Sequence, residues 1–194
     1  MKIAMVIVAV LMLASLCVMG QVAAEVHIAD VQFVGDTKLK DVDLTGCAAD
    51  VKTGRFEGPS WEKQVTSYVK SICLQDNGYF TARVTTSTKQ LADKNGTHQF
   101  LVTINIEAGP QYRLGEVRFT GNQAIASMEL RALFQAQPGN VFRLRAVRDG
   151  IALMRKSYKA HGYPDFTPIP DFSIDNAKRV ITVIIDIDEG KRTD

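Results

Sequence analysis

The side chains that most often carry out chemistry are sparse in this 194-residue sequence. The chain has three histidines, and they lie far apart: His27, His98 and His161. The acidic residues Asp186, Asp188 and Glu189 lie along the end of an expected strand, next to a turn. They fall on separate faces and lack further ligands, which argues against a metal site. The sequence contains no nucleophile elbow, phosphate-binding loop or Ser-His-Asp order. We therefore expect a non-catalytic protein with no metal and no other cofactor.

Two cysteines have the spacing of a possible disulfide. Cys47 and Cys73 both lie in the first half of the chain, and a metal site would need further ligands near them. In an oxidising compartment such a pair can form a disulfide that stabilises a domain with a small core. The alternative is that both are small buried apolar side chains that never pair.

The N-terminus predicts export. Lys2 supplies one positive charge, residues 3–20 contain no charged side chain, and small residues lead up to Ala24. This pattern is typical of a signal peptide over residues 1–24 that is cleaved after Ala24. The alternative is an uncleaved anchor in the inner membrane, because about 18 apolar residues can just span a bilayer. Either outcome exports the rest of the chain.

The exported part has an almost balanced charge. The whole chain contains 23 Lys and Arg against 21 Asp and Glu, and only one of the basic residues lies in the leader. Nucleic acids and anionic membranes are bound by clustered Lys and Arg. We therefore expect no nucleic-acid partner, and the lack of catalytic motifs gives no support for a small-molecule substrate.

An internal repeat divides the exported part into two copies. Three motifs recur in the same order, at offsets of 86, 84 and 81 residues. The matched segments are Asp30–Asp36 with Glu116–Asn122, Asn77–Tyr79 with His161–Tyr163, and Val102–Gly109 with Val183–Gly190. A period of this length is too long for a solenoid repeat and indicates two tandem domains. The two copies are joined directly through residues 107–112, so we expect a fairly rigid pair.

Hydrophobic periodicity predicts the order strand, helix, helix, strand, strand in each copy. In the first copy we expect strands at 27–34, 79–88 and 99–107 and helices at 41–50 and 60–77, with Ser60 as the N-cap of the longer helix. In the second copy we expect strands at 112–119, 166–174 and 179–188 and helices at 127–135 and 144–160, with Ser127 as a cap. Prolines at 164, 168 and 170 place the strand at 166–174 on a sheet edge.

The second copy carries a set of residues that closely resembles the POTRA (polypeptide-transport-associated) domain. The set comprises Phe119-Thr-Gly-Asn122, the spacing of Gly150, Tyr158 and Gly162-Tyr163, and Ile185-x-Ile-Asp-Glu-Gly190. The resemblance extends over residues 113–190 and, more loosely, over 27–109. In the first copy Asp36, Leu74 and Ala108 replace the Asn, Tyr and Glu of the pattern.

The resemblance implies the fold and the compartment. It implies an α+β fold of two tandem β-α-α-β-β modules at residues 25–110 and 111–190, followed by a tail at 191–194. Each module would be a three-stranded mixed sheet with two antiparallel helices on one face. POTRA domains belong to the superfamily of outer-membrane protein assembly and two-partner secretion factors, in which they stand on the periplasmic side, usually before a β-barrel. The chain ends four residues after the second closing glycine, so we expect no barrel in it. This departure argues against the family's insertase role for the protein acting alone, and it stays open whether a barrel is encoded separately or lost.

The resemblance also indicates where a partner could bind. The strand after the second helix is the exposed edge in this fold, and an extended peptide can add to such an edge through main-chain hydrogen bonds. In the first module this edge carries Thr81, Arg83, Thr85 and Thr86, and no proline interrupts it. The second edge, with Phe166 and Phe172, should accept a strand less well because of its prolines. The alternative is that both edges are simply solvated.

Three functions therefore remain open at this point, and all involve binding. The first is a periplasmic module that binds unfolded or extended outer-membrane protein chains, alone or with a separate barrel subunit. The second is an envelope or division scaffold that the uncleaved N-terminal segment anchors in the inner membrane. The third is a truncated remnant of a barrel-bearing assembly factor.

Overall fold

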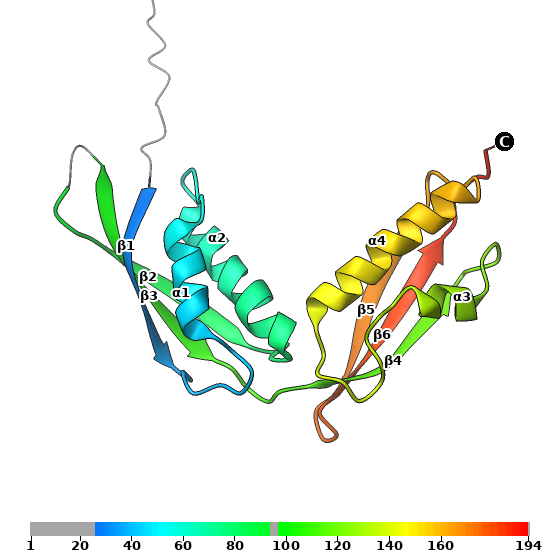
Figure 1. Cartoon of the computed structure of the whole chain (residues 1–194), viewed down its shortest axis with the longest axis horizontal. Helices are drawn as coiled ribbons and strands as arrows, with labels where there is room; N and C mark the ends of the chain where they lie inside the picture. The colour runs from blue at the N-terminus through cyan, green and yellow to red at the C-terminus, as the bar shows by residue number, and fades with distance from the viewer. Residues whose placement is uncertain (1–25, 94–96, 194) are drawn as a thin grey trace, which may run out of the picture.

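The protein folds into two α+β units that follow one another along the chain (Figure 1). The structure, a computed structural model, describes residues 26–93 and 97–193, and the predicted leader at 1–24 lies outside these ranges. The first unit consists of β1 (Val26–Gly35), α1 (Leu44–Thr53), α2 (Trp61–Tyr68), the π-helix η1 (Val69–Leu74), the 3-10 helix η2 (Gln75–Asn77), β2 (Arg83–Gln90) and β3 (His98–Glu107). The second consists of β4 (Arg113–Thr120), α3 (Ser127–Ala132), α4 (Leu144–Ala160), β5 (Thr167–Asp175) and β6 (Val180–Asp188).

Each unit contains one three-stranded mixed sheet with its helices on one face (Figure 1). The strand order is β1-β3-β2 in the first sheet and β4-β6-β5 in the second. In both, the central strand runs parallel to the first strand and antiparallel to the strand after the helices. The predicted fold class is therefore confirmed.

The two sheets have separate cores. On β3, Val102, Ile104 and Ile106 are fully buried beneath the helices, as their alternation predicts. The first core is completed mainly by Val51, Val65, Val69 and Leu74. The second core contains Leu130, Phe142, Met154, Tyr158, Ile181, Val183 and Ile185. Burial of each large apolar side chain contributes about 1.5–3 kcal/mol, so these clusters provide the main driving force for each unit.

The first helix starts three residues later than the sequence predicts. Asp41 has a φ angle of 61°, which is incompatible with the helix expected at 41–50. Asp43 is the N-cap, and its Oδ1 accepts a hydrogen bond of 3.0 Å from the backbone N–H of Gly46. Asp43 therefore acts as the cap of α1 instead of a residue within the helix, and this role fixes the start of the helix at Leu44.

The second helix of the first unit changes its winding along its length. It begins after Ser60, as predicted, but the Ser60 side chain makes no capping hydrogen bond. α2 then passes into η1 and η2, and Gly78 ends the run with a φ of 90°. A Cβ atom at Gly78 would lie 2.8 Å from Cγ1 of Val141, so glycine is required there for conformation and for contact with the second unit.

Two further expectations need correction. Ser127 is the first residue of α3 and not its cap; its Oγ donates to Oδ1 of Asn122, while Ala126 holds the N-cap position. α3 ends at Ala132 instead of continuing to 135. The guanidinium of Arg131 donates to the carbonyl oxygens of Phe134 and Ala136, which stabilises a turn in place of another helical turn.

Candidate peptide-binding edges

β2 is an outer strand of the first sheet, where the sequence places the binding edge. Its inner side pairs with β3 without interruption from Arg83 to Gln90. The structure shows no strand paired with the outer side among residues 26–93 and 97–193. β2 contains no proline, so each of its outward N–H groups is free to donate to an added strand.

The four predicted edge residues do not share one environment. Arg83 and Thr85 are exposed on the face of the sheet away from the helices, and Arg83 lies 3.9 Å from Glu107 in an ion pair that solvent weakens. Thr86 points the other way, because its Oγ1 accepts a hydrogen bond of 2.7 Å from Oγ1 of Thr66 on α2. Thr81 precedes the strand and lies in a turn. Of the four predicted residues, only Arg83 and Thr85 therefore present exposed side chains on that face of β2.

The strand after the second helix starts later than expected because the chain first makes a turn. The N–H of Tyr79 donates to the carbonyl of Leu74, and the N–H of Ala82 donates to the carbonyl of Tyr79. These bonds hold residues 79–82 in a turn, so the expected strand at 79–88 begins at Arg83.

β5 is the outer strand of the second sheet, as its prolines predict. The two aromatic residues proposed for this edge, however, point inward. Phe166 is 4% exposed and stacks on Tyr158, with ring centroids 4.0 Å apart. Phe172 packs against Phe80 of the first unit at a centroid distance of 5.0 Å. The large hydrophobic side chains that β5 does expose are Ile169, at 57%, and Ile174, at 37%.

Sequence reasoning did not consider the opposite edges, although a three-stranded sheet always has two. The outer side of β4 is partly covered, because the N–H of Leu114 donates to Asn140 and the N–H of Gly139 donates back to Leu114. β1 has no such cover among the described residues. A register shift between Ile28 and Asp30 interrupts its pairing, and irregularities of this kind discourage addition of another strand.

The two cysteines meet between the helices of the first unit. Cys47 lies on α1 and Cys73 on η1, with their Cα atoms 6.1 Å apart and their sulfur atoms at bonding distance. This placement is compatible with the predicted disulfide. A bond here would tie α1 to the second helix of the same unit.

The two units meet through an aromatic cluster. Phe80 of the first unit contacts Phe142 and Phe172 of the second, with ring centroids 5.2 and 5.0 Å away. The main chain adds a hydrogen bond of 2.8 Å from the N–H of Tyr112 to the carbonyl of Gly78. Aromatic contacts and a main-chain hydrogen bond therefore support the short connection between the two copies, an arrangement that favours a rigid pair.

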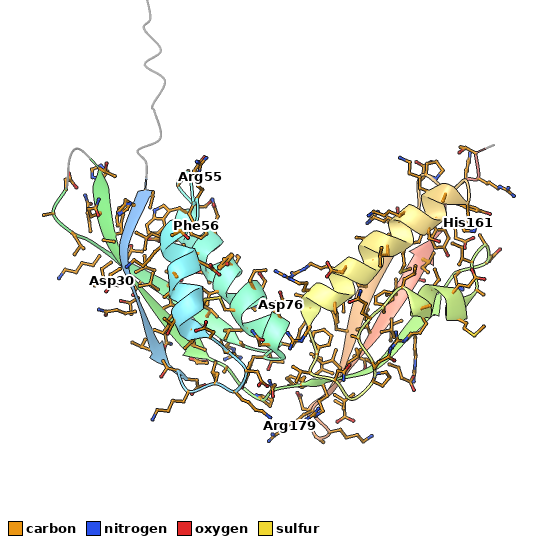
Figure 2. The ribbon with its side chains drawn as sticks, viewed as in Figure 1. Asp30, Arg55, Phe56, Asp76, His161 and Arg179 are labelled. Carbon is orange, nitrogen blue, oxygen red and sulfur yellow. A yellow bond between two sulfur atoms is a disulfide. The ribbon has the colours of Figure 1, made fainter. Side chains whose placement is uncertain are left out.

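Asp76 completes this junction at the start of α4 (Figure 2). Its Oδ1 accepts a hydrogen bond of 2.6 Å from the backbone N–H of Arg145, and both carboxylate oxygens accept from the Arg148 guanidinium at 3.2 Å. α4 has no side-chain cap of its own. A residue of the first unit thus satisfies a free N–H of a helix in the second, where the helix dipole also favours negative charge.

A second acidic residue holds together the closing turn of the second unit. Oε1 of Glu189 accepts hydrogen bonds from the backbone N–H groups of Gln123 and Ala124 and from the Tyr158 hydroxyl, at 2.7, 2.8 and 3.0 Å. Burial, together with the neighbouring carboxylate, raises the pKa of Tyr158 well above its usual value. This network explains why Tyr158 and Glu189 occur together.

The family comparison agrees with this geometry. The sequence profile named POTRA, described as a surface antigen variable number repeat, matches residues 26–109 and 112–190. The chain belongs to the POTRA family. POTRA domains are non-enzymatic, and this chain is accordingly a non-catalytic protein.

Relatives of known structure share the tandem POTRA fold. The crystal structure of POTRA domains 3–5 of Haemophilus influenzae BamA superposes with a TM-score of 0.64, at 20% identity, over 87% of this chain and 67% of that one. POTRA domains 1–2 of Anabaena Omp85 give a TM-score of 0.51 at 19% identity, over 88% and 96% of the two chains.

A curated sequence relative is much longer. A putative outer membrane protein assembly factor of Treponema pallidum (strain Nichols) is 27% identical over an alignment of 173 residues, and the match covers 84% of this chain. The present chain spans only about a fifth of the length of that relative.

The first POTRA copy replaces the polar network of the second with apolar contacts. Leu74 and Ala108, which stand in for Tyr158 and Glu189, are both buried. Asp36 then takes over the polar role, since its Oδ2 accepts a hydrogen bond of 2.9 Å from the N–H of Ala108. In this copy, apolar packing of Leu74 and Ala108 and the hydrogen bond to Asp36 therefore replace the hydrogen bonds that Tyr158 and Glu189 form in the second copy.

Within 26–93 and 97–193, no three His, Cys, Asp or Glu side chains lie close enough to hold a metal ion. No helix in the same ranges is both long enough and apolar enough to cross a membrane.

Proposed function

We propose that this chain is a periplasmic docking module that binds extended polypeptides during outer-membrane protein assembly or secretion. The observation that carries the proposal is the proline-free outer edge of β2 in a POTRA domain. A strand added there gains main-chain hydrogen bonds that do not depend on its sequence, so one edge can accept many client chains.

The comparisons support the setting of this proposal. The Treponema pallidum relative is named as a putative outer membrane protein assembly factor, and the Haemophilus influenzae match consists of BamA POTRA domains. Our proposed clients are unfolded or extended outer-membrane protein chains. A barrel subunit, encoded separately or continuous with this segment, is the proposed partner. Export by residues 1–24, and the division at 25–110 and 111–190, belong to the same proposal.

Site-specific photo-crosslinking in cells tests the proposal directly. A photoreactive amino acid at Arg83 lies on β2, and the same amino acid at Ile169 lies on β5 as a matched control, because both side chains are exposed edge residues. We expect the Arg83 probe to capture outer-membrane protein chains or a barrel subunit, and the Ile169 probe to capture much less.

Two results would contradict the proposal. Equal capture from both probes would show that the β2 edge has no special role. Capture of inner-membrane division proteins at Arg83, without outer-membrane proteins, would instead favour an anchored envelope scaffold.

A further inference from the structure

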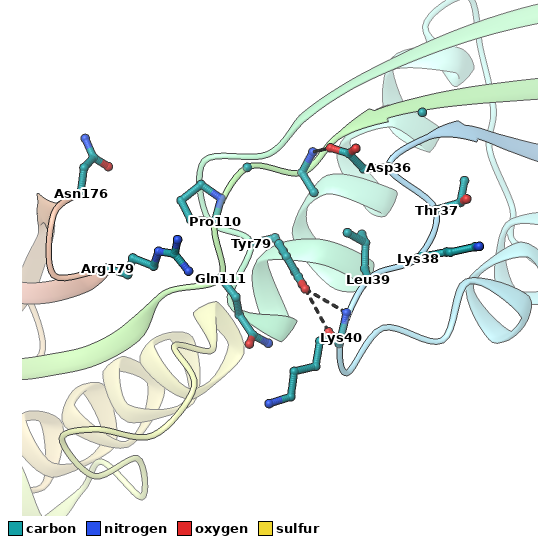
Figure 3. Close-up of a pocket in the computed structure, with 13 residues that line it drawn as sticks. Asp36, Thr37, Lys38, Leu39, Lys40, Tyr79, Pro110, Gln111, Asn176 and Arg179 are labelled. Atoms are coloured by element: carbon teal, nitrogen blue, oxygen red, sulfur yellow. Dashed lines mark hydrogen bonds between the residues drawn. The ribbon is translucent and has the colours of Figure 1, made fainter.

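A groove lies along the connection between the two POTRA domains (Figure 3). Its volume is about 1050 Å³, at the upper end of the range of ligand sites. The first domain contributes the segment 35–40 and Tyr79, the connection contributes 108–111, and the second domain contributes Asn176 and Arg179. We call this feature the junction groove.

Three cations line the junction groove from both domains. Lys38 and Lys40 come from the segment after β1, and Arg179 comes from the turn between β5 and β6. None of the three lies within 4.0 Å of a carboxylate in the described part of the chain. Asp36, the acidic lining residue, already accepts the N–H of Ala108. The N–H is neutral and leaves the charge of Asp36 in place, so the three cations outnumber this one carboxylate and the lining keeps a net positive charge.

The wall that carries the lysines is held in a fixed conformation. The Tyr79 hydroxyl accepts a hydrogen bond from the N–H of Lys40 at 3.0 Å and donates to its carbonyl at 3.2 Å (Figure 3). Tyr79 itself is buried, and half-buried Leu39 and Pro110 add apolar surface to the lining. A bound segment would therefore find apolar contact beside the three charges without first ordering this wall.

Arg179 occupies its place at a conformational cost. Its φ angle is 54°, in the left-handed region that side chains other than glycine, asparagine and aspartate rarely adopt. Its carbonyl accepts the N–H of Arg113, so the backbone there is held by the sheet. Glycine would fit this backbone better, and the exposed arginine side chain forms no ion pair with any residue of 26–93 or 97–193 in return. Strain of this kind is concentrated at functional sites.

We propose that the junction groove binds an acidic, extended segment of a partner protein, with its carboxylates on Lys38, Lys40 and Arg179. This proposal rests on the proposed function as a polypeptide-binding module and adds a second, charge-selective contact to it. Charge complementarity identifies the occupant, and the apolar lining favours a peptide with hydrophobic residues between its acids.

Binding of a designed peptide to the purified full chain tests the proposal. The probe is a fluorescent ten-residue peptide of alternating glutamate and valine, and its lysine-valine counterpart is the charge control. We expect the acidic probe to bind, and to bind less tightly as salt is raised, because exposed charges are screened. The lysine peptide should bind far more weakly.

Variants locate the binding in the groove. Arg179→Gly should reduce affinity about fivefold without lowering the unfolding midpoint, since glycine suits the backbone, and Arg179→Lys should retain most of the affinity. Lys38→Gln with Lys40→Gln should add a further reduction. Lys178→Gln is the matched control, because Lys178 is the adjacent cation and already pairs with Asp175 at 3.4 Å.

The outcomes separate this proposal from the proposed function. Arg179→Gly should leave photo-crosslinking from Arg83 on β2 unchanged, so loss of crosslinking alone would affect only the edge-strand proposal. Equal affinity of the Arg179→Gly and unsubstituted chains for the acidic peptide would overturn the groove proposal. So would binding of vesicles of anionic phosphatidylglycerol that depends on the same three cations while the peptide fails to bind.

Discussion

At the residue scale, the Tyr158–Glu189 pair shows how a family motif acts through structure. The Tyr158 hydroxyl donates to a carboxylate that also accepts two backbone N–H groups from the turn after β4. A hydrogen bond to a charged group contributes about 1.5–3 kcal/mol. We expect Tyr158→Phe to lower the free energy of unfolding by roughly this amount, as measured by denaturant titration. Tyr163→Phe is the control, because no hydrogen bond from that hydroxyl is found in the described structure.

The same tyrosine predicts a dependence of stability on alkaline pH. The pKa of Tyr158 is raised in the folded state, mainly by burial, so the folded protein retains a proton that the unfolded chain releases above about pH 10. Its contribution to stability is therefore full below pH 10 and declines as the pH rises further. We expect the unfolding midpoint to fall between pH 9.5 and 11 in the unsubstituted chain and to fall less in Tyr158→Phe. Parallel curves for the two proteins would refute this assignment.

The cysteine pair gives a third prediction at this scale. A disulfide between Cys47 and Cys73 would close a loop with a sequence separation of 26 residues. By the chain-entropy estimate, such a loop contributes about 3 kcal/mol. We expect reduction with dithiothreitol to lower the free energy of unfolding by about this much, whereas the double variant Cys47→Ser, Cys73→Ser should not respond to the reductant. No response in the unsubstituted chain would mean that the cysteines remain unpaired.

At the scale of the elements, the two sheets contain a matched comparison of an open edge and a blocked one. Pro168 and Pro170 pair with Ile187 and Ile185, and the ladder between β5 and β6 remains continuous around them. Because proline cannot donate a hydrogen bond, it fits such a ladder where the N–H would face outward. The internal repeat aligns Pro170 with Thr86, which pairs with Ile104 in the same relative register.

This alignment predicts how to close the β2 edge without unfolding the domain. Thr86→Pro should place proline at an outward-facing position, as Pro170 does, and so reduce photo-crosslinking from Arg83 while the chain stays folded. The loss of the Thr66 hydrogen bond should cost about 1 kcal/mol. Thr85→Pro is the contrasting variant, since it should remove an inward hydrogen bond to β3 and lower the unfolding midpoint more. Crosslinking that persists in Thr86→Pro would contradict strand addition at β2.

The elements also show which features the sequence could predict. Alternating and continuous apolar runs are local, so the order of elements followed from them, and the edge position of β5 followed from its prolines. The exact helix ends could not be predicted from these runs. Asp43 binds a backbone N–H at the start of α1 and Arg131 binds a backbone carbonyl after α3, and hydrophobic periodicity does not predict such side-chain hydrogen bonds. Thr86 was assigned to the outer face because its partner Thr66, 20 residues earlier, is invisible in the strand pattern.

At the scale of the whole molecule, the junction between the domains depends on contacts that the sequence pattern does not contain. Phe80 and Phe172 were expected on edge strands, yet they meet each other across the junction. Phe80 and Phe172 lie 92 positions apart along the chain, and no periodicity links them. Only the short connection at residues 107–112 signalled that the two domains would be held closely together.

Asp76 offers the sharpest test of that rigidity. Its side chain is 11% exposed, and it satisfies the N–H of Arg145 and the charge of Arg148 at once. Asp76→Ala would leave the start of α4 without a cap and would remove the ion pair, so we expect the junction to loosen while each domain keeps its own core. Spin labels at Lys63 on α2 and Lys156 on α4 would then report a broader distance distribution than in the unsubstituted chain.

The comparison needs a control for charge alone. Asp76→Asn retains an oxygen that can accept the N–H of Arg145 but loses the charge that attracts Arg148, so it should broaden the distribution less than alanine does. Asp171→Asn, on the exposed surface of β5, should have no effect. If Asp76→Ala leaves the distribution unchanged, the aromatic cluster and the main-chain hydrogen bond from Tyr112 to Gly78 are sufficient to hold the domains. If the distribution broadens, Asp76 is needed beside these contacts to fix the two domains, and its loss should weaken binding of the acidic peptide more than it affects crosslinking at Arg83.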